Sequence, residues 1–95
     1  MLGAVAERQK DPAKDEANRR KHGVSFSEAV SAFMDPLSLT ISDLDHSGDE
    51  ERFLLLGESH KGQLLVVSHT DSQDRIRIIS VRKADHRERR EYEQG

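Results

Sequence analysis

Three short runs rich in Leu, Val and Ile follow one another in the second half of the chain, at residues 52–57, 64–69 and 75–81. Each run has the length and aliphatic content typical of a β-strand. A turn around Gly62 separates the first two runs, and residues 71–74 favour another turn before the third. Because successive strands joined by short turns pair in antiparallel fashion, the sequence predicts a small antiparallel sheet.

The first third of the chain carries start and stop signals for a helix over residues 12–22. Asp11 can accept hydrogen bonds from the first free amides, and Pro12 suits the first helical position because its missing N–H has no partner there. Gly23 favours the left-handed conformation that ends many helices. This helix contains only two alanines as apolar residues, so we expect it to bury little surface.

A second helix is predicted after Ser25, which has capping-box spacing to Glu28, so that the Glu28 side chain is expected to reach back to the cap. Asp35-Pro36 ends this helix. Apolar residues recur in it at helical spacing and should supply much of the core: Phe26, Ala29, Val30 and Phe33.

Two further segments complete the predicted order. Residues 37–42 alternate like a strand and precede a polar, acidic loop at 43–50, and residues 85–93 are most simply a helix. The fold class is therefore α+β, a small antiparallel sheet of three to four strands packed against two N-terminal helices and one C-terminal helix. At 95 residues, the chain is expected to form one domain over 1–95.

Composition limits stability and excludes several kinds of site. Hydrophobic residues make up 34% of the chain and charged residues 35%, so we expect a thin core and a stability near the low end of roughly 5–15 kcal/mol. The absence of cysteine excludes disulfides and thiolate metal sites and fits a reducing compartment. The five histidines lack the spacing of metal ligands, so no metal or cofactor is expected.

The chain contains no apolar stretch near the roughly 20 residues that a membrane span requires. The apolar run at residues 2–6 is too short for the core of a signal peptide. A soluble, cytoplasmic protein without a membrane partner is expected.

Cationic residues gather at the two ends of the chain. Residues 1–21 carry a net charge of +2 and residues 75–95 carry +3, whereas residues 22–74 carry −8. Because arginine is seldom buried unless paired, the arginines of the last strand and helix favour an anionic partner: RNA, DNA or an acidic protein. The alternative is a solvated surface on which these arginines pair with Glu88, Glu91 and the acidic loop.

Strict alternation along residues 75–82 predicts two mixed faces. One face would carry Arg75, Arg77, Ile79 and Val81. The other would carry Ile76, Ile78, Ser80 and Arg82. The apolar residues of such a strand could pack against a core, while its cationic residues contact a phosphate backbone.

Two histidines are candidates for different roles. His22 ends the first helix, where a cation is favoured by the helix dipole. Near a cationic cluster its neutral form would be favoured, which also suits a general base. His69, near the end of an apolar strand, is expected to be structural.

Short motifs recur along residues 11–95: Asp11-Pro12-Ala13-Lys14, Asn18, Lys21-His22-Gly23-Val24-Ser25-Phe26, Asp35-Pro36, Glu51-Arg52, Gly57, Arg77-Ile78-Ile79-Ser80-Val81-Arg82, Glu88-Arg89 and Tyr92. In this order and spacing they resemble the BrnT family, the toxins of type II toxin–antitoxin pairs. Each motif is short, but their order covers nearly the whole chain.

The resemblance implies a fold, an activity and partners. BrnT proteins are similar to the wider RelE-like ribonucleases, and they act as endoribonucleases that inhibit translation and arrest growth. A BrnA-like antitoxin, encoded beside the toxin, is implied as the protein partner, in a heterotetramer. RNA is the implied substrate, and operator DNA is contacted only through the antitoxin.

Carried over by position, the resemblance implies these catalytic residues: His22, Arg52, Arg77, Arg82 and Glu88. Metal-free RNA cleavage requires that the 2′-hydroxyl lose its proton, that the phosphorane charge be stabilised, and that the leaving 5′-oxygen gain a proton. The arginine fork suits the second task, since it matches two phosphate oxygens at once. His22 is the candidate for proton transfer, with Glu88 as an alternative base. Further RNA contacts are expected from Lys14, Lys21, Arg75, Lys83 and Arg89.

Residues 1–10 are divergent or poorly ordered in this reading. In the family, the Asp-Pro-x-Lys motif follows an opening strand with aromatic residues, whereas residues 6–10 read Ala-Glu-Arg-Gln-Lys. Loss of a strand that pairs in the sheet would expose an edge and weaken a thin core. This departure favours an alternative function, a catalytically impaired RelE-like binding module that only complexes its antitoxin or co-represses the operon.

Overall fold

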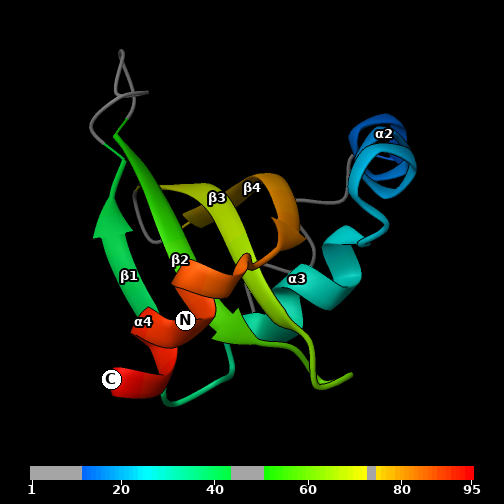
Figure 1. Ribbon diagram of the computed structural model, residues 1–95. Coiled ribbons are helices and arrows are strands. Elements are labelled where there is room, and N and C mark those ends of the chain that lie inside the picture. Colours follow the sequence, from blue (N-terminus) through cyan, green and yellow to red (C-terminus); the bar gives the residue numbers. More distant parts are fainter. Residues whose placement is uncertain (1–11, 44–50, 73–74) are drawn as a thin grey trace.

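A four-stranded antiparallel sheet lies at the centre of the protein (Figure 1). The computed structural model describes residues 12–43, 51–72 and 75–95. The described elements are α2 (Pro12–His22), α3 (Phe26–Ala32), β1 (Leu39–Ser42), β2 (Arg52–Glu58), β3 (Leu64–Ser72), β4 (Arg75–Lys83) and α4 (His86–Gln94). The strand order β1-β2-β3-β4 is a meander, which confirms the α+β class and the predicted antiparallel sheet.

The predicted element positions hold, with shifts at their ends. The first strand begins at Leu39 rather than at residue 37, and β3 and β4 each extend beyond their predicted ends, to Ser72 and Lys83. The predicted hairpin turn is confirmed, with Gly62 at a φ of +77°. Four expectations lie wholly or partly outside the described residues: the Asp11 cap, the loop at 43–50, the turn at 71–74 and the structure of residues 1–10.

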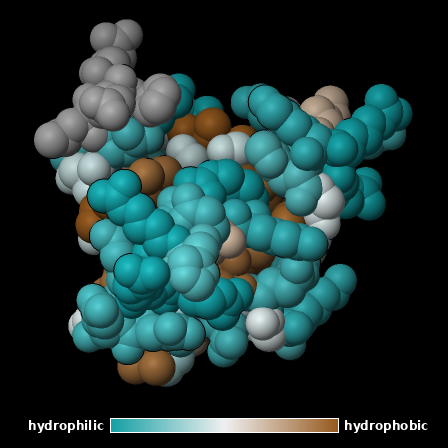
Figure 2. Space-filling model, viewed as in Figure 1, coloured by the Kyte–Doolittle hydropathy of each residue, from teal (hydrophilic) through white to brown (hydrophobic). Residues whose placement is uncertain are grey.

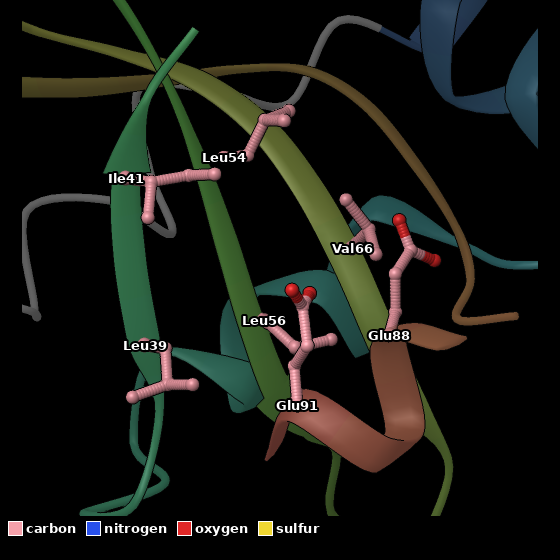
Figure 3. Close-up of a pocket in the computed structure, with 7 residues that line it drawn as sticks. All are labelled: Leu39, Ile41, Leu54, Leu56, Val66, Glu88 and Glu91. Carbon is pink, nitrogen blue, oxygen red and sulfur yellow. The ribbon is translucent and has the colours of Figure 1, made fainter. Parts of the chain in front are cut away.

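Helices α3 and α4 lie on opposite faces of the sheet (Figures 1 and 3). The face toward α3 holds the core, whose buried members are Val24, Phe26, Ala29, Ala32, Leu55, Leu65, Val67, Ile78 and Val81. Close approach of α3 to β2 requires Gly57, because a Cβ there would lie 2.7 Å from the carbonyl oxygen of Ala32. Helix α4 has no buried residue of its own, so the face that it shares with the sheet is covered only in part.

Buried polar contacts attach α3 to the β2–β3 hairpin. Ser25 caps α3 as predicted, since its Oγ accepts a hydrogen bond from the Glu28 amide at 3.0 Å. The prediction for the Glu28 side chain is wrong. Its Oε2 accepts from Ser59 Oγ at 2.7 Å and from Gln63 Nε2 at 2.8 Å. These partners hold the carboxylate, which is only 3% exposed, against the hairpin instead of the helix start.

A β-bulge divides β4 into two parts. Ser68 lies opposite Ser80, but the next residue, His69, lies opposite Ile78, so Ile79 is an extra residue on β4. The prediction of two mixed faces is therefore wrong, because it assumed unbroken alternation. Beyond the bulge, Val81 joins the buried core with Ile78. Ile78 and Val81 thereby share the core face, whereas Ser80 and Arg82 lie on the opposite face.

Asn18 of α2 closes the free edge of β4 beside this bulge. Its Nδ2 donates to the carbonyl oxygens of Val81 at 2.8 Å and Val24 at 2.9 Å. Its Oδ1 accepts from the Val81 amide at 3.0 Å. One side chain thus satisfies both outward backbone groups of an edge residue, as a neighbouring strand would. Because Asn18 is 7% exposed, these bonds are shielded from water.

We expect Asn18→Asp to lower the free energy of unfolding by about 2–4 kcal/mol, because a buried carboxylate would face two carbonyl oxygens without a proton to donate. Asn18→Ala should cost about 1–3 kcal/mol through the lost bonds. Urea denaturation at neutral pH measures both changes. Arg20→Ala on the exposed side of α2 is the control, with an expected change under about 0.5 kcal/mol. Equal stability of Asn18→Ala and the wild type would contradict the role given to Asn18.

A second polar contact holds α4. The Tyr92 hydroxyl donates to Asp35 Oδ2, which also accepts from the Glu58 amide at 2.8 Å, while Asp35 Oδ1 accepts from the Leu37 amide at 2.9 Å. Burial raises the pKa of Asp35, but these three hydrogen bonds outweigh burial and bring its pKa below the usual value. The same bond, with burial and nearby carboxylates, raises the pKa of Tyr92 to about 12.

We expect Tyr92→Phe to destabilise the protein by about 0.5–1.5 kcal/mol at neutral pH. The Asp35 pKa is depressed in the folded state, so the stability that this carboxylate contributes is present above its unfolded pKa and is lost as the pH falls through the folded pKa. The difference between the wild type and Tyr92→Phe should therefore shrink below about pH 4. Thermal unfolding from pH 7 to pH 3 measures this convergence, and a difference that grows on acidification would refute it.

Candidate active site

The candidate site lies on the sheet face opposite the core, where β2 and β4 carry two of the predicted catalytic arginines. Arg52 and Arg82 line one cavity, together with Ser68 of the intervening strand β3 and Ser80 of β4. Asp43, Leu54 and Ile79 complete its walls. Arginine forks beside hydroxyl groups form a surface that suits phosphate oxygens.

A row of paired positions places a third arginine beside this cavity. Arg52, Thr70 and Arg77 lie directly opposite one another on β2, β3 and β4. Directly paired residues project from the same face of a sheet, so the two arginines flank Thr70, which is only 3% exposed. Two strand spacings separate them, about 10 Å between their backbones, which is within reach of neighbouring phosphates of one strand of RNA.

Helix α2 contributes a second cavity at the free edge of β4. Lys14, Lys21 and His22 line it, with Ala17 and Asn18. Ile79 and Ser80 complete this cavity, and both residues also line the arginine cavity. The bulge thus forms the boundary between two adjoining cavities that together hold five of the ten predicted site residues: Lys14, Lys21, His22, Arg52 and Arg82.

Arg82 is held by a bidentate ion pair with Glu88. Its two terminal nitrogens donate to the Glu88 carboxylate oxygens at 2.9 and 2.7 Å. This hydrogen bonding raises the pKa of Arg82 and is the main reason why the pKa of Glu88 lies below its usual value. Glu88 also accepts from the Asp85 amide at 2.9 Å, which completes the capping box of α4. An ionised, doubly bonded carboxylate is a weak base, so this geometry favours orientation of Arg82 over proton transfer by Glu88.

The remaining predicted RNA contacts lie away from the two cavities. Arg75 is exposed at the start of β4, and Arg89 is exposed on α4. Lys83 lies opposite Leu65, a core residue, and therefore belongs to the face that carries α3. His69 is structural, as expected: its ring contacts Phe33 edge-on at 4.9 Å between centroids and stacks on Phe53 at 5.8 Å. Burial lowers its pKa and keeps it neutral.

Sequence reasoning gave no role to several residues on which the site depends. The sequence indicates Asn18 only as part of a motif, although a lone amide on a helix nearly free of apolar residues is a signal that the side chain has a specific partner. Ser68 and Thr70 gave no such signal, since an alternating strand places polar residues on one face by default. Their involvement follows from the pairing register, which the sequence alone does not specify.

Within residues 12–43, 51–72 and 75–95, no three His, Cys, Asp or Glu side chains form a group that could hold a metal ion. In the same part of the chain, no helix is both long and apolar enough to cross a membrane.

Comparison with known proteins bears directly on this arrangement. No curated protein sequence matches the chain. A family model, described as the ribonuclease toxin BrnT of type II toxin–antitoxin systems, matches residues 11–88. This match covers most of the chain and includes α2, both cavities and the Arg82–Glu88 pair. The chain therefore belongs to the BrnT family of ribonuclease toxins.

Proposed function

We propose that this protein is the toxin of a type II toxin–antitoxin module and cleaves RNA without a metal ion, at the two adjoining cavities beside the β4 bulge. The observation that carries this proposal is the arginine cavity, in which Arg52 and Arg82 share a wall with the cavity of Lys14, Lys21 and His22. Membership of the BrnT family supports ribonuclease activity and a protein antitoxin as partner. In this proposal the RNA backbone runs from the lysines of α2 to the arginines of the sheet.

Each chemical task has a candidate group in these cavities. His22 takes the proton of the 2′-hydroxyl, whose oxygen attacks the adjacent phosphorus and forms a 2′,3′-cyclic phosphate as the bond to the 5′-oxygen breaks. Arg52 and Arg82 stabilise the charge on the phosphorane, and Arg77 binds a neighbouring phosphate. The protonated His22 then returns a proton to the leaving 5′-oxygen.

The position of Glu88 supports an indirect role. The bidentate pair uses two of the five N–H donors of Arg82, and a hydrogen bond to the Lys83 carbonyl oxygen at 3.3 Å uses a third, so two donors remain for phosphate. Glu88 fixes the plane of the guanidinium and connects it to the start of α4 through Asp85. We assign Glu88 as a positioning residue for Arg82, in place of the general base that was the sequence-based alternative.

The substrate and partners follow from the same family in this proposal. Cleavage of RNA inhibits translation in this proposal, so that growth is arrested. A BrnA-like antitoxin neutralises the toxin in a heterotetramer and alone contacts operator DNA. The small sheet with flanking helices supports a relation to the RelE-like ribonucleases in this proposal, with the cytoplasm as the site of action.

We expect the purified protein to cleave single-stranded RNA in EDTA, and Arg52→Ala or Arg82→Ala to lower the rate by about 10²–10³-fold through lost charge stabilisation. His22→Ala should cost about 10²–10⁴-fold. Cleavage kinetics on a defined oligonucleotide, with detection of the cyclic phosphate end, measure these effects. Arg20→Ala, an exposed arginine of α2 paired with Glu16, should cut like the wild type.

Circular dichroism must show that each variant is folded. Cleavage that survives Arg52→Ala, Arg82→Ala and His22→Ala in folded protein would place the activity elsewhere. Loss of cleavage on addition of EDTA to the wild type would refute the metal-independent mechanism.

Glu88→Gln tests the positioning role. We expect cleavage to fall about tenfold, because the neutral amide no longer holds both terminal nitrogens of Arg82 as strongly, and we expect the pH profile of cleavage to keep its shape. A general base would instead give a profile that loses its acidic limb. Faster cleavage by Glu88→Gln would show that Glu88 blocks Arg82, which contradicts the role proposed for it.

A second candidate function has one observation in its favour. Because Glu88 already neutralises Arg82, the face could serve as a binding module that complexes the antitoxin or co-represses the operon without cutting RNA. Absence of cleavage by a folded wild type that still binds its antitoxin would favour this function over the ribonuclease.

A further inference from the structure

The sheet face that carries the arginine cavity continues into an apolar groove of about 230 Å³. Five aliphatic side chains of β1, β2 and β3 line it: Leu39, Ile41, Leu54, Leu56 and Val66. Helix α4 forms the remaining wall, from which Glu88 and Glu91 project across the front of the strands (Figure 3). Figure 2 shows this side of the molecule, with apolar surface visible between polar residues.

Two features show that the groove is uncovered in the described structure. Ile41 is 62% exposed, although it lies on a strand in the sheet. Helix α4, the element nearest to the groove, has no buried residue and so does not fill it. A large aliphatic side chain held open to water on a rigid strand is a common feature of surfaces that bind another protein.

The charges around the groove identify the kind of occupant. Two carboxylates line an otherwise aliphatic surface: Glu91, which is exposed, and Glu88, whose charge is balanced by Arg82. The Glu91 carboxylate on the wall repels the phosphates of RNA, and the aliphatic floor offers them no donors. A polypeptide with apolar side chains on one face and Lys or Arg beside them satisfies both the floor and the wall.

A second copy of the chain fits the groove poorly. A symmetric contact would bring the same surface of each copy together, so two Glu91 carboxylates would enter one contact. Like charges brought together in a partly desolvated contact oppose association. A positively charged segment of another protein fits the groove better.

We propose that this groove is the docking surface for a positively charged, amphipathic segment of the antitoxin. The proposal rests on the proposed function insofar as the partner is the antitoxin of this toxin family. Leu54 lines both the groove and the arginine cavity, and Glu88 joins the groove wall to Arg82. A segment in the groove therefore lies against the edge of the RNA site and blocks it without any need to enter it.

The test uses the full chain and the antitoxin encoded beside its gene, with binding measured by isothermal titration calorimetry. Ile41→Lys and Glu91→Lys change exposed groove residues outside the proposed catalytic machinery. Each should weaken antitoxin binding by tenfold or more, since each puts a positive charge against a positively charged segment. Met34→Lys and Glu93→Lys are the matched controls, because Met34 is 64% exposed and neither residue lines the groove. Both should bind within about twofold of the wild type.

Cleavage of RNA, measured without antitoxin, separates this proposal from the proposed function. Ile41→Lys and Glu91→Lys should cut like the wild type and resist neutralisation. If the wild type binds antitoxin but cuts no RNA, and both variants lose this binding, the groove proposal is supported and the ribonuclease proposal is refuted. Wild-type affinity in both variants would overturn the groove proposal even if RNA is cut. Light scattering that shows a dimer broken by Ile41→Lys would also overturn it, in favour of self-association.

Discussion

The bulge at Ile79, with the Asn18 amide bonded to Val81 beside it, is the constraint on which the two faces of this small sheet depend. Strand β4 lies at an edge of the sheet and carries both core residues and phosphate-binding candidates. The bulge accommodates Ile79, so that Ile78 and Val81 still enter the same core while Ser80 and Arg82 reach the other face. Asn18 holds the strand in this register from outside and brings α2 against it, so fold and candidate site have a common origin.

The protein uses its few apolar residues on both sides of the sheet. One face is buried under α3, and the other pairs an apolar groove with an arginine cavity. Glu88 lies between the two, as a groove wall and as the partner of Arg82. In the proposed function, this adjacency makes RNA and antitoxin competitors for neighbouring surfaces. In this proposal the Arg82–Glu88 ion pair connects the two surfaces.

Much of the fold could be predicted from local signals. Gly23, Ser25 and Gly62 mark boundaries through backbone conformation or capping, and these signals act over a few residues. The candidate site was harder to predict from the sequence, because it depends on pairing between distant strands. Strict alternation assigned Val81 to the same face as Arg75 and Arg77, and no residue type at 75–82 predicts a bulge. Family resemblance supplied Arg52 and Arg82, whereas only the pairing register places Arg52 and Arg77 on either side of Thr70.

The bulge also has an evolutionary consequence. Because Ile79 is an extra residue without an opposite number on β3, the pairing of its neighbours does not depend on it. Deletion of Ile79 would remove the bulge and leave a regular strand in which Ile78 and Val81 still project from the core face. Insertion or deletion elsewhere in β4 would exchange the faces along part of the strand, so divergent descendants of this protein should replace or lose Ile79 more readily than they change the length of β4 on either side of it.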